Sequence, residues 1–310
     1  MKIAVVQEPP VYLDKAKSIH RAVDLIAKAA SQSCGLIVFP EAWLPGYPTF
    51  VWRLSPGADM KKTDELYALT QKNAVDLSKD DLAPIKEAAR ENAIVVVMGH
   101  QELDGTLSGS TVFNSVAIID ADGKILNNHR KLMPTNPERM VWGFGDGSTL
   151  NVVETAVGRV GALLCWENYM PLARFALYAQ NIDIYCAPTW DSGATWLATM
   201  QHIAREAGCW VVGCATAIEV SDVPDSVIYR DELFPDAGEW INPGDAVVME
   251  PFGGPVAGPM HKEKGLLIAD IDVSAARASR RKFDVTGHYA RPDVFKLTVN
   301  RTPQSPIDFD

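Results

Sequence analysis

The segment GALLCWENYMPLAR, residues 161–174, carries more information about this chain than any other stretch. An apolar, strand-like run over residues 160–164 ends at Cys165, and a helical pattern begins near Pro171. A strand that ends at such a junction places its thiol at the carboxyl edge of a sheet, where open α/β sheets form their crevices. We expect nearby helix N-terminal amides to favour the thiolate there. A buried, inert cysteine fits this segment equally well, because free cysteines pack as small hydrophobes.

A second segment, LIVFPEAWLPGYP, covers residues 36–48. Residues 36–39 are typical of a short buried strand that Pro40 ends, so Glu41 emerges at its carboxyl end beside Trp43 and Tyr47. Burial among aromatic rings raises the pKa of a carboxyl group towards the value that a general base needs near neutral pH. The alternative is an ordinary surface glutamate that follows a strand.

A third segment, HRKLMPTNPER, covers residues 129–139 and follows a predicted hairpin of strands 116–120 and 125–129. Pro134 and Pro137 exclude a regular helix here, so Lys131 and Glu138 are predicted to lie in a stiff loop. A lysine in a loop is usually a solvated charge. A loop stiffened by proline can also hold an ammonium group in place, and binding groups favour such loops.

Together these segments resemble the nitrilase superfamily of carbon–nitrogen hydrolases, which uses a Glu-Lys-Cys triad in this chain order. Glu41, Lys131 and Cys165 fall on the matching positions, and the similarity continues through APTWD and DVTGHYARPDVF. The Cys-Trp-Glu sequence at the nucleophile is similar to the nitrilase branch. The resemblance implies that Glu138 supports the triad by orienting Lys131 or the substrate; pairing with Arg139 is its alternative.

The chemistry of a nitrile agrees with this triad. A nitrile carbon is a weak electrophile, so a thiolate is the best side-chain nucleophile for it. We therefore predict that Cys165 forms a thioimidate and then a thioester, with Glu41 as general base and Lys131 stabilising the developing negative charge. The products are a carboxylic acid and ammonia. An amidase or carbamoylase of the same superfamily, hydration that stops at the amide, and a catalytically silent assembly module are the alternatives.

Aromatic residues lie in or directly after these motifs. Trp190, Trp166 and Tyr47 are candidates to line an apolar pocket that favours aryl or arylalkyl nitriles. The alternative is that the two tryptophans pack the core behind the cysteine.

The composition excludes several classes of function. The chain of 310 residues has 29 basic and 39 acidic residues and a net charge of −10, which argues against binding to nucleic acid or an anionic membrane. Five scattered cysteines predict no disulfide framework, and the opening MKIAVVQEPP predicts no secretory signal, so we expect a cytoplasmic protein. The six histidines show no metal-ligand spacing, and we predict neither a metal nor a cofactor.

Strand-like and helical patterns alternate along the chain, which indicates an α/β fold with mixed sheets. The resemblance refines this prediction to a four-layer αββα sandwich in a single domain over residues 1–310, with a short tail from about residue 302. It also implies a homodimer or higher homo-oligomer, and the short tail argues against a long filament. Residues 246–250 and 266–271 are predicted to form a second hairpin, 221–243 an irregular loop and 251–259 turns. Helices are expected over 15–31, 65–77, 82–91, 171–180, 195–206 and 274–281, and further strands over 3–7, 94–98, 182–187 and 210–214.

Overall fold

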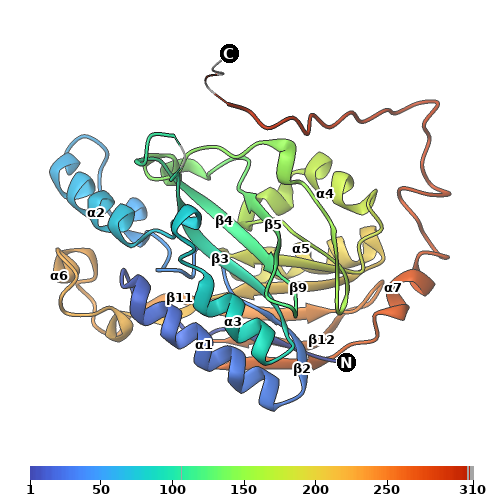
Figure 1. Ribbon diagram of the computed structural model, residues 1–310, viewed down its shortest axis with the longest axis horizontal. Helices are drawn as coiled ribbons and strands as arrows, with labels where there is room; N and C mark the ends of the chain where they lie inside the picture. The colour runs from blue at the N-terminus through green and yellow to red at the C-terminus, as the bar shows by residue number, and fades with distance from the viewer. Residues whose placement is uncertain (106, 306, 308–310) are drawn as a thin grey trace.

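The computed structural model describes residues 1–105, 107–305 and 307. Two β-sheets pack face to face, with helices on both outer sides (Figure 1). The first sheet has the strand order β13-β1-β2-β3-β4-β5, in which β1, β2 and β3 run parallel and the other pairs antiparallel. Its strands are β1 (Lys2–Val6), β2 (Cys34–Val38), β3 (Val95–Leu103), β4 (Val112–Ile119), β5 (Ile125–Arg130) and β13 (Leu266–Asp270).

The second sheet has the order β10-β11-β9-β8-β7-β6, with β12 paired to β11. Strands β7, β8 and β9 are parallel, so their carboxyl ends lie at one edge of the sheet. The strands of this sheet are β6 (Val153–Thr155), β7 (Gly158–Ala162), β8 (Ile184–Thr189), β9 (Trp210–Ala215), β10 (Ala217–Glu219), β11 (Trp240–Met249) and β12 (Pro255–His261).

Three layers of buried apolar side chains hold the sandwich together. One lies between the sheets and joins residues such as Leu36 and Ile118 to Ile184 and Val212. Helices α1 and α3 cover the outer face of the first sheet, and α4 and α5 cover that of the second. The predicted four-layer αββα architecture is therefore confirmed. The helices are α1 (Lys15–Ser31), α2 (Met60–Asn73), α3 (Ala83–Glu91), α4 (Pro171–Tyr178), α5 (Ala194–Ala207), α6 (Arg230–Leu233) and α7 (Ser274–Ser279).

The predicted second hairpin is wrong. Strand β11 pairs with β9 and β12, whereas β13 pairs with β1 in the other sheet, so residues 246–250 and 266–271 lie in different sheets. The pattern misled because the intervening strand β12 contains Pro255, Gly258 and Pro259 and therefore looks like a turn. An exposed edge strand tolerates these residues, since its outer N–H groups need no partner in the sheet.

Other boundaries differ by a few residues. Helix α2 begins at Met60 and ends at Asn73, and β3 extends to Leu103. The predicted irregular loop over 221–243 contains α6 and the start of β11. These segments are polar, so their periodicity is weak, and tertiary pairing decides where they begin and end.

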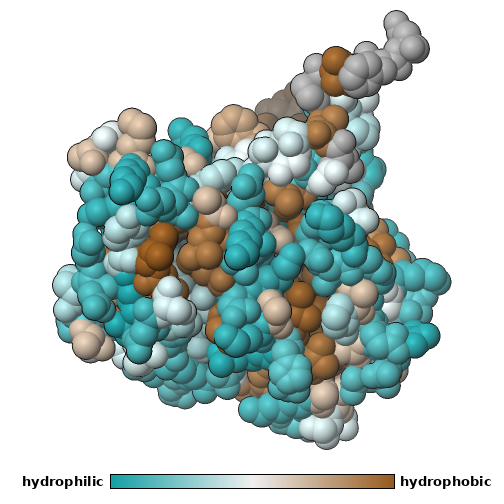
Figure 2. All heavy atoms as spheres, turned by 60° about the vertical axis from the view of Figure 1, so that its left-hand side comes forward, coloured by the Kyte–Doolittle hydropathy of each residue, from teal (hydrophilic) through white to brown (hydrophobic). Residues whose placement is uncertain are grey.

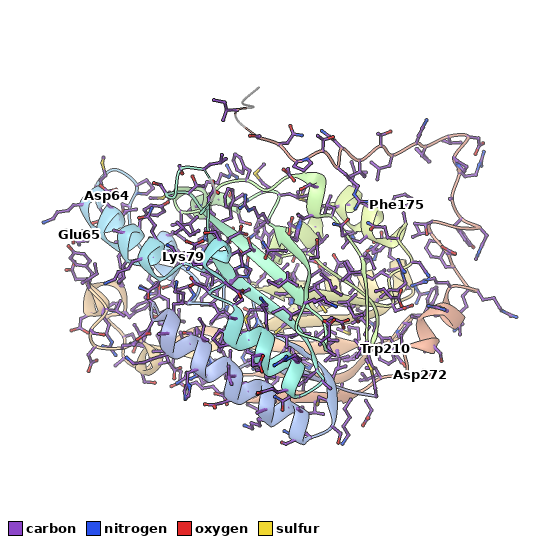
Figure 3. All side chains as sticks on the ribbon, in the orientation of Figure 1. Asp64, Glu65, Lys79, Phe175, Trp210 and Asp272 are labelled. Atoms are coloured by element: carbon purple, nitrogen blue, oxygen red, sulfur yellow. The ribbon has the colours of Figure 1, made fainter. Side chains whose placement is uncertain are left out.

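The C-terminal segment leaves the sandwich after α7 and runs in an extended form along one side (Figure 1). Trp210 anchors the stretch before α7, because its indole N–H donates to the backbone oxygen of Asp272 at 2.7 Å (Figure 3). Of the predicted tail, residues 306 and 308–310 lie outside the described residues. On the face in Figure 2, hydrophobic side chains form small groups separated by hydrophilic ones. Among the described residues, none of the helices has the length and apolarity that a membrane span requires.

Candidate active site

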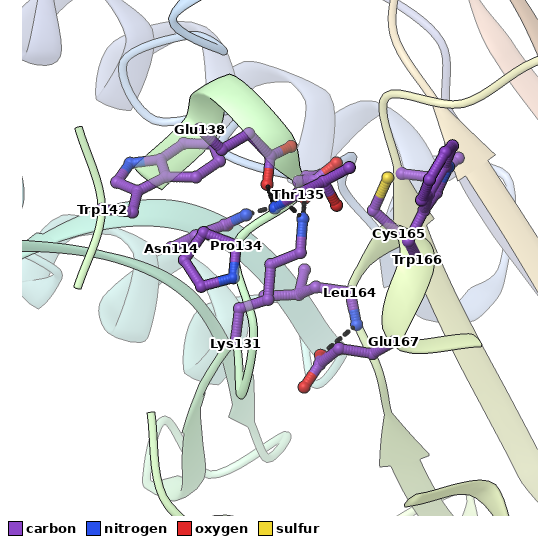
Figure 4. Close-up of polar contacts among 12 residues, drawn as sticks. Asn114, Lys131, Pro134, Thr135, Glu138, Trp142, Leu164, Cys165, Trp166 and Glu167 are labelled. Carbon is purple, nitrogen blue, oxygen red and sulfur yellow. Dashed lines mark hydrogen bonds and ion pairs between the residues drawn. The ribbon is translucent and has the colours of Figure 1, made fainter. Parts of the chain in front are cut away.

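Side chains that follow three strands, two in the first sheet and one in the second, meet between the sheets. Glu41 follows β2, Lys131 follows β5 and Cys165 follows β7. The Lys131 Nζ lies 2.8 Å from Glu41 Oε1 and 2.8 Å from Glu138 Oε2 (Figure 4). The Cys165 Sγ and one carboxylate oxygen from each of the two glutamates all lie within 4.8 Å of one another. The structure therefore brings together the four residues that the sequence singled out for the chemistry.

Cys165 lies in a strained turn. Its φ of 49° is in the left-handed region, which non-glycine residues seldom adopt, and a 3₁₀ helix (Cys165–Tyr169) begins at this residue. The Asn168 side chain holds the turn by donating to the backbone oxygen of Cys165 at 2.7 Å, and it accepts from Tyr185 Oη at 2.7 Å. Strain of this kind persists only where the surroundings enforce it, and here it fixes the position of the thiol.

The expected preference for the thiolate is wrong. Burial raises the pKa of the Cys165 thiol, the Glu41 carboxylate raises it further, and the Lys131 ammonium only partly opposes the two effects. Helix α4 begins only at Pro171, so no regular helix N-terminus starts at the thiol itself. Cys165 is consequently a protonated thiol near neutral pH, and it requires a base before it can act as a nucleophile.

Glu41 is buried and lies beside that thiol. Its Oε1 accepts hydrogen bonds from Asn114 Nδ2 at 2.7 Å and from Lys131 Nζ at 2.8 Å. Its Oε2 is buried without a hydrogen-bond partner among the described residues. Burial raises the pKa of Glu41 above its ordinary value, an effect that Lys131 opposes and Glu138 reinforces. The predicted rise in this pKa is confirmed.

Lys131 is not the solvated loop lysine of the alternative interpretation, because only 1% of its surface is exposed. Burial alone would lower the pKa of the ammonium, but the negative charges of Glu41 and Glu138, joined by that of Cys165 once it has lost its proton, outweigh that effect and raise it. The ammonium also lies 5.8 Å from the centre of the Trp142 ring. Lys131 is therefore a permanent positive charge in a dry site.

Glu138 holds both the lysine and its own loop. Besides Lys131 Nζ, its Oε2 accepts the backbone N–H of Thr135 at 2.6 Å, which caps a short 3₁₀ helix (Asn136–Met140). Its Oε1 accepts from Tyr47 Oη at 2.6 Å. Arg139 instead donates to the backbone oxygen of Pro134, so the alternative of a pair with Glu138 is not observed.

The three candidate aromatic residues occupy two different places. Tyr47 is buried and stacks on Trp190, with ring centres 4.4 Å apart and an interplanar angle of 5°. Trp166 is 46% exposed, and its indole N–H donates to Asp191 Oδ2 at 2.9 Å. Trp166 therefore does not pack into the core behind the cysteine, whereas Trp190 packs against a core cluster that contains Tyr47, and the hydroxyl of Tyr47 reaches Glu138.

Sequence reasoning missed Asn114. This residue lies in β4 and contacts both Glu41 and Lys131, since its side chain donates to the Glu41 carboxylate and its backbone oxygen accepts the backbone N–H of Lys131 at 2.8 Å. The signal was available: Asn114 and Ser115 form a fully buried polar pair inside the otherwise apolar run VFNSVAII.

Sequence reasoning also missed the structural task of Glu167. Its carboxylate accepts the backbone N–H of Leu132 at 2.8 Å and that of Leu164 at 2.8 Å. It also lies 3.1 Å from His129 Nε2, while His129 Nδ1 is paired with Thr149 at 3.0 Å. Burial raises the pKa of Glu167, but the interaction with His129 and the hydrogen bonds from the Leu132 and Leu164 N–H groups outweigh burial. The pKa is therefore lowered, and Glu167 remains a carboxylate. One buried anion therefore joins the residue after Lys131 to the residue before Cys165.

A metal ion does not suit this group of side chains. Among the described residues, Glu41, Glu138 and Cys165 have the spacing of a metal site. The Lys131 ammonium, however, already bonds to both carboxylates at 2.8 Å and takes the place that a cation would occupy. The donor set is therefore complete without a metal.

Comparisons with known proteins agree with this fold and this set of residues. Residues 2–281 match the carbon-nitrogen hydrolase family, so the chain belongs to that family. Its sequence is 39% identical to an aliphatic nitrilase of Sinorhizobium fredii (strain HH103), over 99% of this chain and 97% of that protein. It is 38% identical to a bifunctional nitrilase/nitrile hydratase of Nicotiana tabacum, over 100% of this chain and 88% of that protein. Within the family, the chain falls in the nitrilase branch.

Solved structures support the fold. The NitFhit protein of C. elegans superimposes with a TM-score of 0.72 at 20% sequence identity, over 98% of this chain and 68% of that one. Nit3 of Saccharomyces cerevisiae, a member of branch 10 of the nitrilase superfamily, has a TM-score of 0.68 at 19% identity, over 93% of this chain and 96% of that one.

Proposed function

We propose that this enzyme converts an organic nitrile to the carboxylic acid and ammonia, with Cys165 as nucleophile, Glu41 as general base and Lys131 as the stabilising cation. The observation that carries the proposal is a buried thiol within 4.8 Å of a buried glutamate, which has one unpartnered oxygen and accepts a hydrogen bond from the Lys131 ammonium through the other. The sequence similarity to nitrilases supports the choice of a nitrile as substrate.

The reaction begins when Glu41 takes the thiol proton and Cys165 Sγ attacks the nitrile carbon. One C–N π pair moves to nitrogen, which receives the proton, and a thioimidate forms. Lys131 stabilises the negative charge on nitrogen at this step. Water activated by Glu41 then adds to the carbon. The C–N bond breaks, ammonia departs, and the acyl group remains on Cys165 as a thioester. A second water breaks the C–S bond, releases the acid and restores the thiol.

The stacked pair of Tyr47 and Trp190, which reaches Glu138 through the Tyr47 hydroxyl, supports our proposal of aryl or arylalkyl nitriles, because a flat ring packs well against aromatic side chains. A relative with an aliphatic substrate in its name makes an aliphatic nitrile the competing class. A bifunctional relative makes release of the amide a second product to measure.

Ammonia release from a small panel tests the proposal. The panel contains benzonitrile, phenylacetonitrile, an aliphatic dinitrile and the amide that matches each. We expect release from nitriles and little from amides, with aryl and arylalkyl nitriles preferred. Cys165→Ala should lower the rate about 10⁴-fold or more, and Cys165→Ser should also be nearly inactive, because a hydroxyl is the poorer nucleophile.

Cys34→Ala is the matched control, since it removes another thiol near the start of β2 and should leave the rates unchanged. Release from amides alone would show an amidase instead. Rates in Cys165→Ala equal to those of the parent would remove the proposed nucleophile, and silence across the panel would favour an assembly module.

The five cysteines are free and buried, which supports our proposal of a reducing, cytoplasmic location. We also propose that the chain forms a homodimer or higher homo-oligomer. Exposed apolar residues on α4 and the C-terminal segment support this assembly.

A further inference from the structure

The two carboxylate oxygens of Glu41 have different surroundings. Oε1 accepts two hydrogen bonds, from Asn114 Nδ2 at 2.7 Å and Lys131 Nζ at 2.8 Å. Oε2 is buried and has no partner within the described part of the chain. A carboxylate oxygen that already accepts two hydrogen bonds is a poor proton acceptor, so Oε2 is the more basic oxygen.

Asn114 creates this difference. Its side chain is fully buried in β4, and its amide can reach Glu41 Oε1 only by donating, because a carboxylate is purely an acceptor. Its backbone oxygen accepts the Lys131 N–H at 2.8 Å, so the same residue also fixes the start of the lysine loop. Asn114 thus aligns the base and the cation with each other.

We propose that Asn114 is a positioning residue that directs the Cys165 proton to Oε2 of Glu41. This inference rests on the proposed function. In the step concerned, the S–H bond breaks, an O–H bond forms at Oε2, and the sulfur electron pair forms the S–C bond. The proton then passes from Oε2 to the nitrile nitrogen, which has received the π pair.

Loss of Asn114 has a defined effect on pH dependence. The charged groups that face Glu41 are Lys131 after β5 and Glu138 in the 3₁₀ helix, and the titratable groups beside it are the Cys165 thiol after β7 and the Tyr47 hydroxyl. The Asn114 hydrogen bond favours the charged form of Glu41 and lowers its pKa. Without that bond, Glu41 would hold its proton to a higher pH, and the acidic limb of the activity profile would move upward.

Asn114→Leu has a similar size and removes the donor. We expect the acidic limb of kcat/KM for nitrile hydrolysis to move upward by about one to two pH units, from the usual strength of a hydrogen bond to a charged group. At neutral pH we expect kcat to fall about 10- to 100-fold, with a much smaller change in KM. Asn114→Ser, which shortens the side chain, provides a second variant if the leucine protein fails to fold.

Ser115→Ala is the matched control. Ser115 is the next residue in β4 and donates to a different buried carboxylate, Glu102 Oε2, at 2.6 Å. Its removal should leave the pH profile unchanged. If both folded Asn114 variants keep the parental profile, the inference is overturned.

Alkylation of Cys165 by iodoacetamide, followed by mass spectrometry, separates this inference from the proposed function. Its rate follows proton loss from the thiol–Glu41 pair and requires no turnover. If the pH at which the alkylation rate rises is higher in the Asn114 variants than in the parent, the positioning role is supported even if the parent releases no ammonia from nitriles. An unshifted alkylation profile beside a parent that hydrolyses nitriles rejects the role of Asn114 and leaves the proposed function intact.

Discussion

Lys131 carries its charge where a lysine has almost no access to water. Two carboxylates at 2.8 Å compensate for the lost hydration of the buried ammonium. A buried ammonium with two fixed partners is a point charge whose position is set by Glu41 and Glu138. Its proposed role as the stabiliser of the substrate nitrogen therefore depends on its shape as well as on its charge.

Lys131→Arg preserves the charge but spreads it over a longer, planar group. We expect kcat/KM for nitrile hydrolysis to fall by roughly 10²- to 10³-fold, the usual loss when an electrostatic stabiliser is removed. Steady-state kinetics on the preferred nitrile measure the effect, with circular dichroism as a check on the fold. Arg130→Lys makes the reverse exchange at the adjacent residue, which pairs with Glu102, and should have little effect. Near-parental kinetics in Lys131→Arg would show that Lys131 does not stabilise the transition state.

At the scale of secondary-structure elements, the site depends on how strand ends are joined across the two sheets. Lys131 follows β5 in the first sheet, and Cys165 follows β7 in the second. The Glu167 carboxylate connects them, since one oxygen accepts the Leu132 N–H and the other accepts the Leu164 N–H, each at 2.8 Å. The distance between Cys165 and Lys131 is therefore fixed by Glu167, a third residue in the same 3₁₀ turn as Cys165.

Glu167→Gln keeps the size of this side chain but replaces one acceptor with an NH₂ group. The backbone N–H of Leu132 or of Leu164 would then face another donor, and the segments that carry Lys131 and Cys165 would separate. We expect kcat for nitrile hydrolysis to fall on the order of 10²-fold, because small misplacements of reacting groups cause losses of this size. Glu206→Gln, which alters a carboxylate paired with Arg174 and Tyr178 on the outer side of the second sheet, is the control. A folded Glu167→Gln protein with parental kcat would contradict this coupling.

The sequence was sufficient to predict the elements that carry strong periodicity and the residues that end strands. Helix α1 matches its predicted bounds, and Glu41, Lys131 and Cys165 lie together as expected. Interactions between distant segments could not be predicted in this way. β12 was missed because its prolines and glycines are tolerated only at an edge, and the raised pKa of Cys165 depends on burial beside Glu41.

At the scale of the whole molecule, the outer side of α4 is more apolar than a solvent-exposed surface requires. Leu172 is 66% exposed on α4, and Phe295 is 78% exposed on the C-terminal segment. Between them lies a groove of about 600 Å³ that is also lined by Phe175 and Tyr289. Exposed apolar side chains that line a common groove are a feature of contacts between proteins, and a second copy of the chain is the occupant that we propose.

Introduction of a positive charge into this surface tests the assembly. Leu172→Lys and Phe295→Lys each place an ammonium in the proposed contact, where two copies would bury it without a partner. We expect the mass measured by light scattering after size-exclusion chromatography to fall towards that of a single chain. Ile228→Lys changes another exposed apolar residue, just before α6 on the opposite side of the molecule (Figure 1), and should leave the mass unchanged. If both lysine variants keep the mass of the parent, any self-association uses a different surface. If the parent itself has the mass of a single chain, the proposed assembly is wrong. The groove is then only the boundary between α4 and the C-terminal segment.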